Sequence, residues 1–196
     1  MRIYFDMDGV LSDFVGGVLN LYSASANISD VRRDMWVDLG FSSESEFWRS
    51  LSILGGFPFW AGLKRLADGV DLLNRVESYI NTYSYDYSNT RISILSTPAK
   101  TYGCCDGKQD WITRNLPYYE GRLFLGEDKS VHAGPDAILI DDKDENIEKF
   151  EFAGGYRLLI PRPWNSHRNE CDSEGNFDVD RVFNDFIDTM RIANLD

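Results

Sequence analysis

The sequence has few histidines and cysteines, and it has no long hydrophobic run. Because a membrane-spanning helix needs about 20 consecutive apolar residues, we expect no spanning segment. The chain has only two histidines, His132 and His167, which gives little support for a histidine-based metal site or a Ser-His triad. The N-terminus lacks the basic region and the apolar stretch of a secretion signal, so we expect no leader to be removed.

The three cysteines, Cys104, Cys105 and Cys171, are an adjacent pair and one distant residue. This spacing is typical of neither a disulfide framework nor a zinc site. Reduced thiols in a cytoplasmic protein are therefore expected. A redox function of the adjacent pair is the less favoured alternative.

Basic residues are also in the minority, with 20 Lys and Arg against 32 Asp and Glu, and the net charge is -12. Binding to a nucleic-acid polymer depends on many contacts between Lys or Arg and phosphates, so this balance argues against such a partner. A small phosphorylated substrate stays compatible with it, because a few local cations and a metal ion can reverse the field within one cleft. Solubility alone is the simpler explanation of the acidic surface.

The chain has enough apolar residues for one core and a small subdomain, with 43% hydrophobic and 14% aromatic residues. Short apolar runs predict strands at residues 2–5, 91–96, 121–126, 136–142 and 156–161. Helical periodicity predicts helices at residues 12–22, 67–79, 106–116, 146–152 and 178–192. This alternation predicts an α/β fold with a Rossmann-like parallel sheet and helices on both faces.

Residues 27–66 differ from the rest of the chain, because they are rich in aromatic residues and combine short helical patterns with Gly-Gly and Pro breaks. We interpret this stretch as a small, mainly helical insertion. The expected domain organisation is a core made of residues 1–13 and 67–196, and a helical cap of residues 14–66 inserted after the first strand and its loop.

Short polar motifs follow four of the predicted strands. They contain Asp6 and Asp8, Ser96 and Thr97, Lys129, and Asp141 and Asp142. Each motif alone has a simple explanation, since D-x-D-G is a common turn and an Asp pair after a strand is a common helix N-cap. Their joint occurrence, each after its own strand, favours a catalytic site, because reactive groups of such sheets gather beyond the carboxyl ends of the strands.

The residue types at these strand ends are those that phosphoryl transfer requires. Asp6 can attack a phosphorus atom and form an aspartyl-phosphate. Asp8 can protonate the leaving alkoxide and later activate water. Gly9 permits a tight turn and a close approach of the backbone to the phosphate. Ser96 and Lys129 can hold the non-bridging phosphate oxygens.

A divalent cation would offset the charge of these carboxylates. Mg²⁺ prefers oxygen ligands and keeps several waters, so few protein ligands suffice. The candidates are Asp6, the backbone carbonyl of Asp8, and Asp142, with Asp141 as a further candidate. We therefore expect Mg²⁺ as the cofactor.

Four stretches, "FDMDGVLSDF", "ILSTP", "GEDKS" and "ILIDDKDENI", resemble the four motifs of the haloacid dehalogenase-like phosphatase superfamily. The second aspartate of the first motif resembles the phosphatases and mutases, in which this residue is the general acid/base. The resemblance implies a catalytic core of the haloacid dehalogenase type with Asp6 as nucleophile, Asp8 as acid/base and Asp142 as metal ligand. It also implies that Ser96 and Lys129 hold the phosphate.

The stretches "STPAK" and "KQDWI", together with the helical insertion, narrow the resemblance to the 5'(3')-deoxyribonucleotidase family. This family implies Mg²⁺-dependent hydrolysis of deoxyribonucleoside monophosphates. The positions that match the phosphate and nucleoside contacts of the family are Thr97, Lys100, Lys108, Phe14, Trp36 and Val37. Met35 stands where an aromatic residue is expected, and Ser-Thr replaces the more familiar Thr-Ser order, so the base preference stays open.

Stacking of a base on an aromatic side chain contributes roughly 1–3 kcal/mol. Phe14, Trp36 and Trp48 are the candidates for this contact, although aromatic residues of a small cap also form its own core. The stretch "AGGYRLLIPRPWN" is expected to be structural, with Arg162 or Trp164 as candidates for the rim of the cleft.

Two alternatives to a nucleotidase remain at this point. One is a phosphatase for another small phosphomonoester such as a phosphosugar, and the other is a catalytically silent nucleotide-binding protein. The expected partner is a small nucleotide, and neither a nucleic-acid polymer nor a membrane is expected. The oligomeric state stays open between a monomer and a homodimer.

Overall fold

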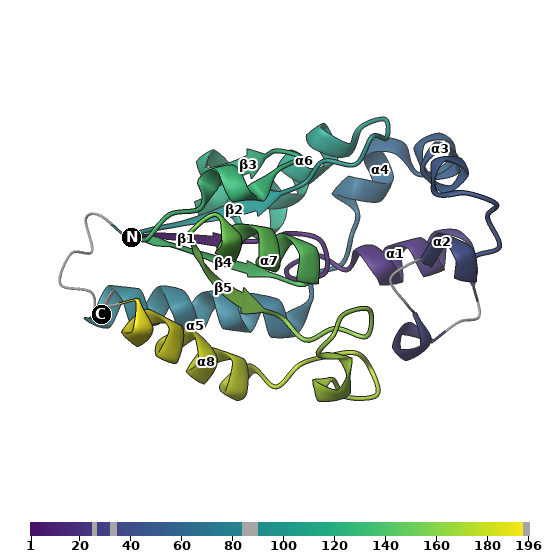
Figure 1. Cartoon of the computed structure of the whole chain (residues 1–196). Helices are drawn as coiled ribbons and strands as arrows, with labels where there is room; N and C mark the ends of the chain where they lie inside the picture. The colour runs from purple at the N-terminus through teal and green to yellow at the C-terminus, as the bar shows by residue number, and fades with distance from the viewer. Residues whose placement is uncertain (25–26, 32–34, 84–89, 194–196) are drawn as a thin grey trace.

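The computed structural model describes residues 1–24, 27–31, 35–83 and 90–193. Within these residues one parallel sheet is formed in the order β3-β2-β1-β4-β5 (Figure 1). Its strands are β1 (Arg2–Phe5), β2 (Arg91–Ser96), β3 (Leu123–Leu125), β4 (Ala137–Asp141) and β5 (Tyr156–Leu159). The prediction of an α/β fold with a parallel sheet is confirmed.

The helices alternate with these strands in the core and are consecutive in the insertion. They are α1 (Phe14–Leu21), α2 (Met35–Asp38), α3 (Glu44–Leu54), α4 (Gly56–Ala61), α5 (Ala67–Tyr83), α6 (Cys104–Asn115), α7 (Asp144–Phe152) and α8 (Val179–Ile192). Short 3₁₀ helices are η1 (Ile28–Asp30), η3 (Pro117–Arg122), η4 (Lys129–His132) and η5 (Arg168–Glu170). In Figure 1 helices α1 to α4 lie beyond the carboxyl ends of the strands, where the sequence predicts a cap.

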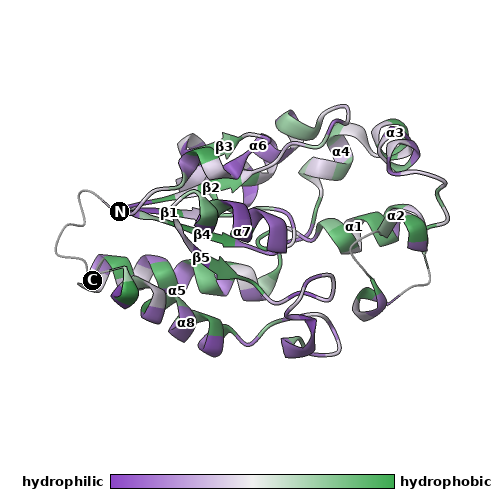
Figure 2. Ribbon diagram, in the orientation of Figure 1, coloured by the Kyte–Doolittle hydropathy of each residue, from purple (hydrophilic) through white to green (hydrophobic). Residues whose placement is uncertain are grey.

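Strand β1 is central, and its side chains alternate between two hydrophobic clusters. Ile3 and Phe5 belong to the larger cluster, which also contains buried residues of α5, α6 and α8. Tyr4 belongs to the smaller cluster with Phe150 of α7. This alternation follows from the two-residue period of a strand that is covered on both faces. Figure 2 shows hydrophobic and hydrophilic residues alternating along α5 and α8, as expected for helices that cover a sheet.

Element boundaries differ from the predicted ones at two informative places. The predicted strand 121–126 is only three residues long, because Pro117 starts a 3₁₀ helix that continues to Arg122. The first helix begins at Phe14 rather than at residue 12, because the side chain of Asp13 accepts a hydrogen bond from the backbone N–H of Gly16 and caps the helix.

Among the described residues, no helix is both long and apolar enough to cross a membrane.

Cysteine alkylation provides a direct test of the packing around the thiols. All three cysteines are free; Cys104 is buried and Cys105 is exposed. Burial raises the pKa of both the Cys104 and the Cys171 thiol to about 11. At pH 8 these two residues are expected to be thiolates to only about one part in a thousand. Iodoacetamide should therefore label Cys105 of the native protein first, as read by peptide mass spectrometry. Equal labelling of all three cysteines before unfolding would contradict the packing.

Candidate active site

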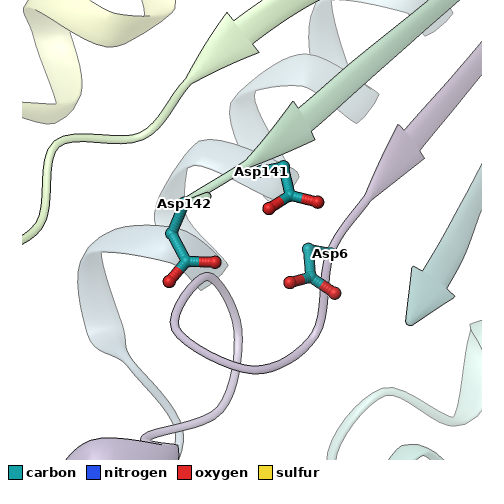
Figure 3. Close-up of side chains that lie close together, drawn as sticks. All are labelled: Asp6, Asp141 and Asp142. Atoms are coloured by element: carbon teal, nitrogen blue, oxygen red, sulfur yellow. The ribbon is translucent and has the colours of Figure 1, made fainter. Parts of the chain in front are cut away.

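Three carboxylates meet at the carboxyl ends of the neighbouring strands β1 and β4. Asp6 follows β1, Asp141 ends β4, and Asp142 is the next residue (Figure 3). All three are buried, and one ligand atom from each lies within 4.8 Å of the others. The strands bring them together because β1 and β4 are paired in parallel register, with Phe5 beside Ile140.

Lys129 offsets part of this negative charge. It is the first residue of η4, and its buried Nζ lies 2.7 Å from Oδ1 of Asp6 and 2.6 Å from Oδ2 of Asp141. Burial alone would lower the pKa of Lys129, but the carboxylates of Asp141 and Asp6 outweigh it and raise the pKa. Burial likewise acts to raise the pKa of Asp6, yet the nearby lysines, Lys129 above all, bring it below its ordinary value. The pair is therefore ionised.

The two neighbouring aspartates have different surroundings. Both oxygens of Asp141 accept hydrogen bonds: Oδ1 from the backbone N–H of Lys143, Oδ2 from Lys129, and both from the side-chain amide of Asn146. Oδ1 of Asp142 is buried and has no hydrogen-bond partner among the described residues. Burial, followed by the charges of Asp141 and Asp6, raises the pKa of Asp142 to about 7. Asp142 is thus the carboxylate with an oxygen free to bind a cation.

Asp8 is oriented by two side chains. Its Oδ1 accepts a hydrogen bond from the hydroxyl of Ser12 at 3.1 Å, and its Oδ2 forms an ion pair with Lys108. The fully buried Nζ of Lys108 also donates to the hydroxyl of Ser96 at 2.7 Å and to the carbonyl of Thr97 at 3.3 Å. Lys108 therefore connects the end of β2 to the loop after β1.

Gly9 permits the close approach of that loop to Asp142. Its φ is +81°, and a Cβ at this position would lie 2.2 Å from Oδ2 of Asp142. The sequence-based expectation of a tight turn at Gly9 is confirmed by this backbone conformation. A residue with a side chain would be excluded by both strain and contact.

A cleft of about 410 Å³ opens above these groups. Its floor includes Asp8, Gly9 and Asp142, and its walls include Phe14, Met35, Trp36, Trp48, Trp60 and Trp164. The ring of Phe14 is stacked between Trp60, at a centroid distance of 5.4 Å, and Trp48, at 6.0 Å. Some aromatic side chains of the cap therefore pack against one another and also line the cleft.

Two positions that the family resemblance places near the substrate lie elsewhere. The side chain of Val37 is 55% exposed and is not part of the cleft wall. Neighbouring residues of a helix differ in direction by about 100°, so α2 directs Met35 and Trp36 to the cleft and Val37 away from it. The side chain of Lys100 is 86% exposed, and its Nζ lies 3.5 Å from Oε1 of Glu127. Residues 32–34, which directly precede Met35 and Trp36 in the sequence, lie outside the described residues.

The structure adds residues that the sequence does not single out. Lys143 lines the cleft, and the carboxylates of Asp142, Asp6 and Asp141 raise its pKa although burial acts in the opposite direction. Asn146 holds Asp141, as described above. The sequence feature that could have identified Lys143 and Asn146 is their position in "DDKDEN", where both follow the aspartates within one helical turn.

Comparison with known proteins agrees with this geometry. The model of the family "5' nucleotidase, deoxy (Pyrimidine), cytosolic type C" matches residues 1–187. The mitochondrial 5'(3')-deoxyribonucleotidase of Mus musculus is 27% identical over 155 residues, which are 74% of this chain and 66% of that protein. The cytosolic 5'(3')-deoxyribonucleotidase of Homo sapiens is also 27% identical over 155 residues, which are 74% of this chain and 71% of that protein. The chain thus spans about two thirds of the length of these relatives.

Solved structures show the fold. A haloacid dehalogenase-like hydrolase from Streptococcus pneumoniae superposes with a TM-score of 0.53 at 15% identity, covering 94% of this chain and 97% of its own. A candidate β-phosphoglucomutase from Thermotoga maritima also reaches 0.53, at 13% identity, covering 95% and 98%. The fold is therefore haloacid dehalogenase-like, as the sequence motifs predict.

Proposed function

The chain belongs to the cytosolic type C family of deoxy 5' nucleotidases, and we propose that it hydrolyses deoxyribonucleoside monophosphates to nucleoside and phosphate. Nucleotidases are phosphoric monoester hydrolases. The observation that carries the proposal is the cleft itself, which joins a floor that includes Asp8 and Asp142 to aromatic walls, close to the buried pair of Asp6 and Lys129. Its volume lies in the range of small-molecule sites. The floor suits a phosphate group, and the walls suit a planar base.

Mg²⁺ is the proposed cofactor, held by Asp6, Asp142 and the backbone carbonyl of Asp8. The fit rests on the free Oδ1 of Asp142 and on the cluster of carboxylate oxygens around it. Asp141 is less suited to the ion, because its oxygens already accept hydrogen bonds, and its proposed contribution is to orient Lys129. When bound, the ion would neutralise charge on the phosphate and on the carboxylates.

Asp6 is the proposed nucleophile. Its lowered pKa keeps it ionised, and attack of a carboxylate oxygen on phosphorus breaks the bond to the substrate alkoxide. Asp8 in its protonated form gives its proton to that alkoxide, and the carboxylate so formed takes a proton back from the water that attacks phosphorus and breaks the bond to Asp6. Lys108 and Ser12 hold Asp8 in the orientation that both steps require.

Residues near Asp6 are proposed to hold the phosphate oxygens. Lys129 and Ser96 are the first of these, and Thr97, which lines the cleft, is the third. Lys108, which bonds to both Ser96 and Asp8, is proposed to contribute to the phosphate site as well. Lys100, with its long and exposed side chain, stays a prediction from the family resemblance.

Residues 14–66 are proposed to act as a cap on a core of residues 1–13 and 67–196. Phe14, Trp36 and Trp48 would contact the base, and closure of the cap would exclude water from the reacting phosphate. A cytoplasmic location is proposed as well, in keeping with the name of the human cytosolic relative. The proposed reaction needs a small nucleotide, and neither a nucleic-acid polymer nor a membrane.

A substrate panel tests the function. Phosphate release is measured with Mg²⁺ for dTMP, dUMP, dGMP and their ribose counterparts, for glucose 6-phosphate, and for an aryl phosphate. Stacking of the base, at roughly 1–3 kcal/mol, should favour deoxynucleotides over the sugar phosphate by about 10- to 100-fold in kcat/KM. EDTA should abolish release from every substrate.

Each contrary outcome of the panel would point to a different alternative to the proposed function. A preference for glucose 6-phosphate would replace the nucleotidase with a sugar phosphatase. Release from none of the compounds, the aryl phosphate included, would identify a silent binding protein. Activity that survives EDTA would remove the Mg²⁺ assignment.

A further inference from the structure

The four residues Arg162 to Asn165 make hydrogen bonds to both loops that carry the proposed Mg²⁺ ligands. They follow β5, and their sequence is "RPWN". Arg162 bonds to the loop after β1, whereas Trp164 and Asn165 bond to the residue after β4. This segment is named the 162–165 clamp below.

Arg162 holds the loop after β1 through its backbone. Its Nε donates to the carbonyl oxygen of Gly9 at 2.7 Å. Its two terminal nitrogens donate to the two carboxylate oxygens of Asp68 on α5, at 2.7 and 3.0 Å, and one of them also donates to the carbonyl of Gly175. Both members of this ion pair are buried, so the guanidinium cannot turn without leaving a buried charge unpaired.

Trp164 and Asn165 hold Asp142 from the other side. The indole N–H of Trp164 donates to Oδ2 of Asp142 at 2.5 Å. The side-chain amide of Asn165 donates to the backbone carbonyl of Asp142 at 2.8 Å, and to that of Ile160 at 2.7 Å. Because Oδ2 is bonded to the indole, Oδ1 is the oxygen of Asp142 that is left without a hydrogen-bond partner among the described residues, and Asp142 contributes one oxygen to the carboxylate cluster.

We propose that the 162–165 clamp is a positioning device that fixes the distance between the Asp6–Gly9 loop and Asp142, and thereby sets the affinity for Mg²⁺. The inference rests on the Mg²⁺ site of the proposed function. The clamp holds the carbonyl of Gly9 and the carboxylate of Asp142, and these two residues lie so close that a Cβ on Gly9 would be 2.2 Å from Oδ2 of Asp142. None of its residues needs to touch substrate for this effect. Partners that orient metal ligands commonly contribute 10- to 100-fold to metal affinity.

Trp164→Phe is the sharpest test, because it removes the N–H that holds Asp142 and keeps an aromatic ring. Mg²⁺ binding is measured by calorimetric titration without substrate, with thermal unfolding beside it. We expect binding of Mg²⁺ to weaken by about 10-fold or more. In assays, the Mg²⁺ concentration that gives half-maximal activity should rise by a similar factor.

Trp111→Phe is the matched control. The indole of Trp111 also donates one hydrogen bond, to the backbone carbonyl of Leu63 at 2.7 Å, and it is buried and does not line the cleft. The same chemical change there should lower the unfolding temperature without weakening Mg²⁺ binding.

Arg162→Lys tests the other half of the clamp. A lysine keeps the charge near Asp68 but cannot bond to both carboxylate oxygens and to Gly9 at once. We expect weaker Mg²⁺ binding again, by about 10-fold. Arg75→Lys is its control, since Arg75 pairs with Asp71 and Asp180 on the surface. If Arg162→Lys fails to fold, Trp164→Phe alone decides, because Trp164 is only half-buried.

The outcomes separate the clamp from the site that it serves. Wild-type affinity in Trp164→Phe overturns the clamp and leaves the Mg²⁺ site standing. Equal weakening in Trp111→Phe also overturns it, since the effect would then come from general destabilisation. A wild-type protein that binds no Mg²⁺ overturns the site and the clamp together.

Discussion

Asp6→Asn is expected to lower kcat by on the order of 10⁴-fold or more, while the fold stays intact. An amide has no anionic oxygen to attack phosphorus, so the aspartyl-phosphate cannot form. Asparagine keeps the shape of the side chain beside Lys129, and the variant also loses one of three neighbouring carboxylate charges. Thermal unfolding and phosphate release, measured on the same preparation, separate the chemical effect from a structural one.

The covalent step has its own measurement. Wild-type enzyme is quenched during turnover of a nucleotide that is labelled in its phosphate group. The protein should retain the label, and hydroxylamine should remove it, because hydroxylamine cleaves acyl phosphates. Asp6→Asn should retain no label. Asp136→Asn is the matched control, because Asp136 pairs with Arg2 at the other end of β4. It should keep full activity. Normal turnover in Asp6→Asn would end the assignment of Asp6 as nucleophile.

The sheet and the strand-end groups could be predicted because their signals are local. An apolar run followed directly by a carboxylate, as at Phe5–Asp6 and Ile140–Asp141, reports both the strand and its end within a few residues. The rule that parallel strands end at one edge then brings these groups together without further information. Lys129 follows the predicted strand at residues 121–126 after a short loop, so the same reasoning includes it.

Contacts between distant segments could not be predicted in this way. Lys108 and Asp8 are 100 residues apart, and Arg162 and Gly9 are 153 residues apart. No pattern within either segment reports its partner. Arg162 follows an apolar strand and precedes a proline. This sequence context is as typical of an exposed loop residue as of a buried arginine that pairs with a carboxylate. Its burial depends on Asp68, whose own sequence context is an ordinary first turn of a helix.

The cap shows the limit of family resemblance as a source of side-chain positions. The resemblance places Trp36 and Val37 together, but the backbone of α2 separates their directions. The stacking of Phe14 on Trp60 and Trp48 depends on α1, α3 and α4 meeting, which aromatic content alone does not determine. Composition predicts that aromatic residues gather in the cap, and tertiary packing decides which of them face the cleft.

Gly9→Ala is expected to lower kcat by about 100-fold, the size of effect that a displacement near 1 Å in an active site can produce. The new Cβ would lie 2.2 Å from Oδ2 and 2.7 Å from Cγ of Asp142. Neither Asp142 nor the backbone of Gly9 can move easily. Asp142 is held by Trp164 and Asn165, and the Gly9 carbonyl is held by the buried Arg162. The collision should therefore displace a proposed Mg²⁺ ligand, which steady-state kinetics and a Mg²⁺ titration would both record.

Backbone strain is the competing explanation of a loss in kcat, and Gly154→Ala is the control for it. Gly154 has a φ of +90°, close to that of Gly9, but a Cβ there would meet nothing within 4 Å. Both variants should lose about 1–3 kcal/mol of stability from a left-handed alanine, and Gly9→Ala should lose more because its Cβ also collides with Asp142. Only Gly9→Ala should lose kcat and Mg²⁺ affinity. If Gly154→Ala lost as much activity, strain rather than contact with Asp142 would be the cause. If Gly9→Ala kept wild-type kcat, the two loops would not need their close approach for the reaction.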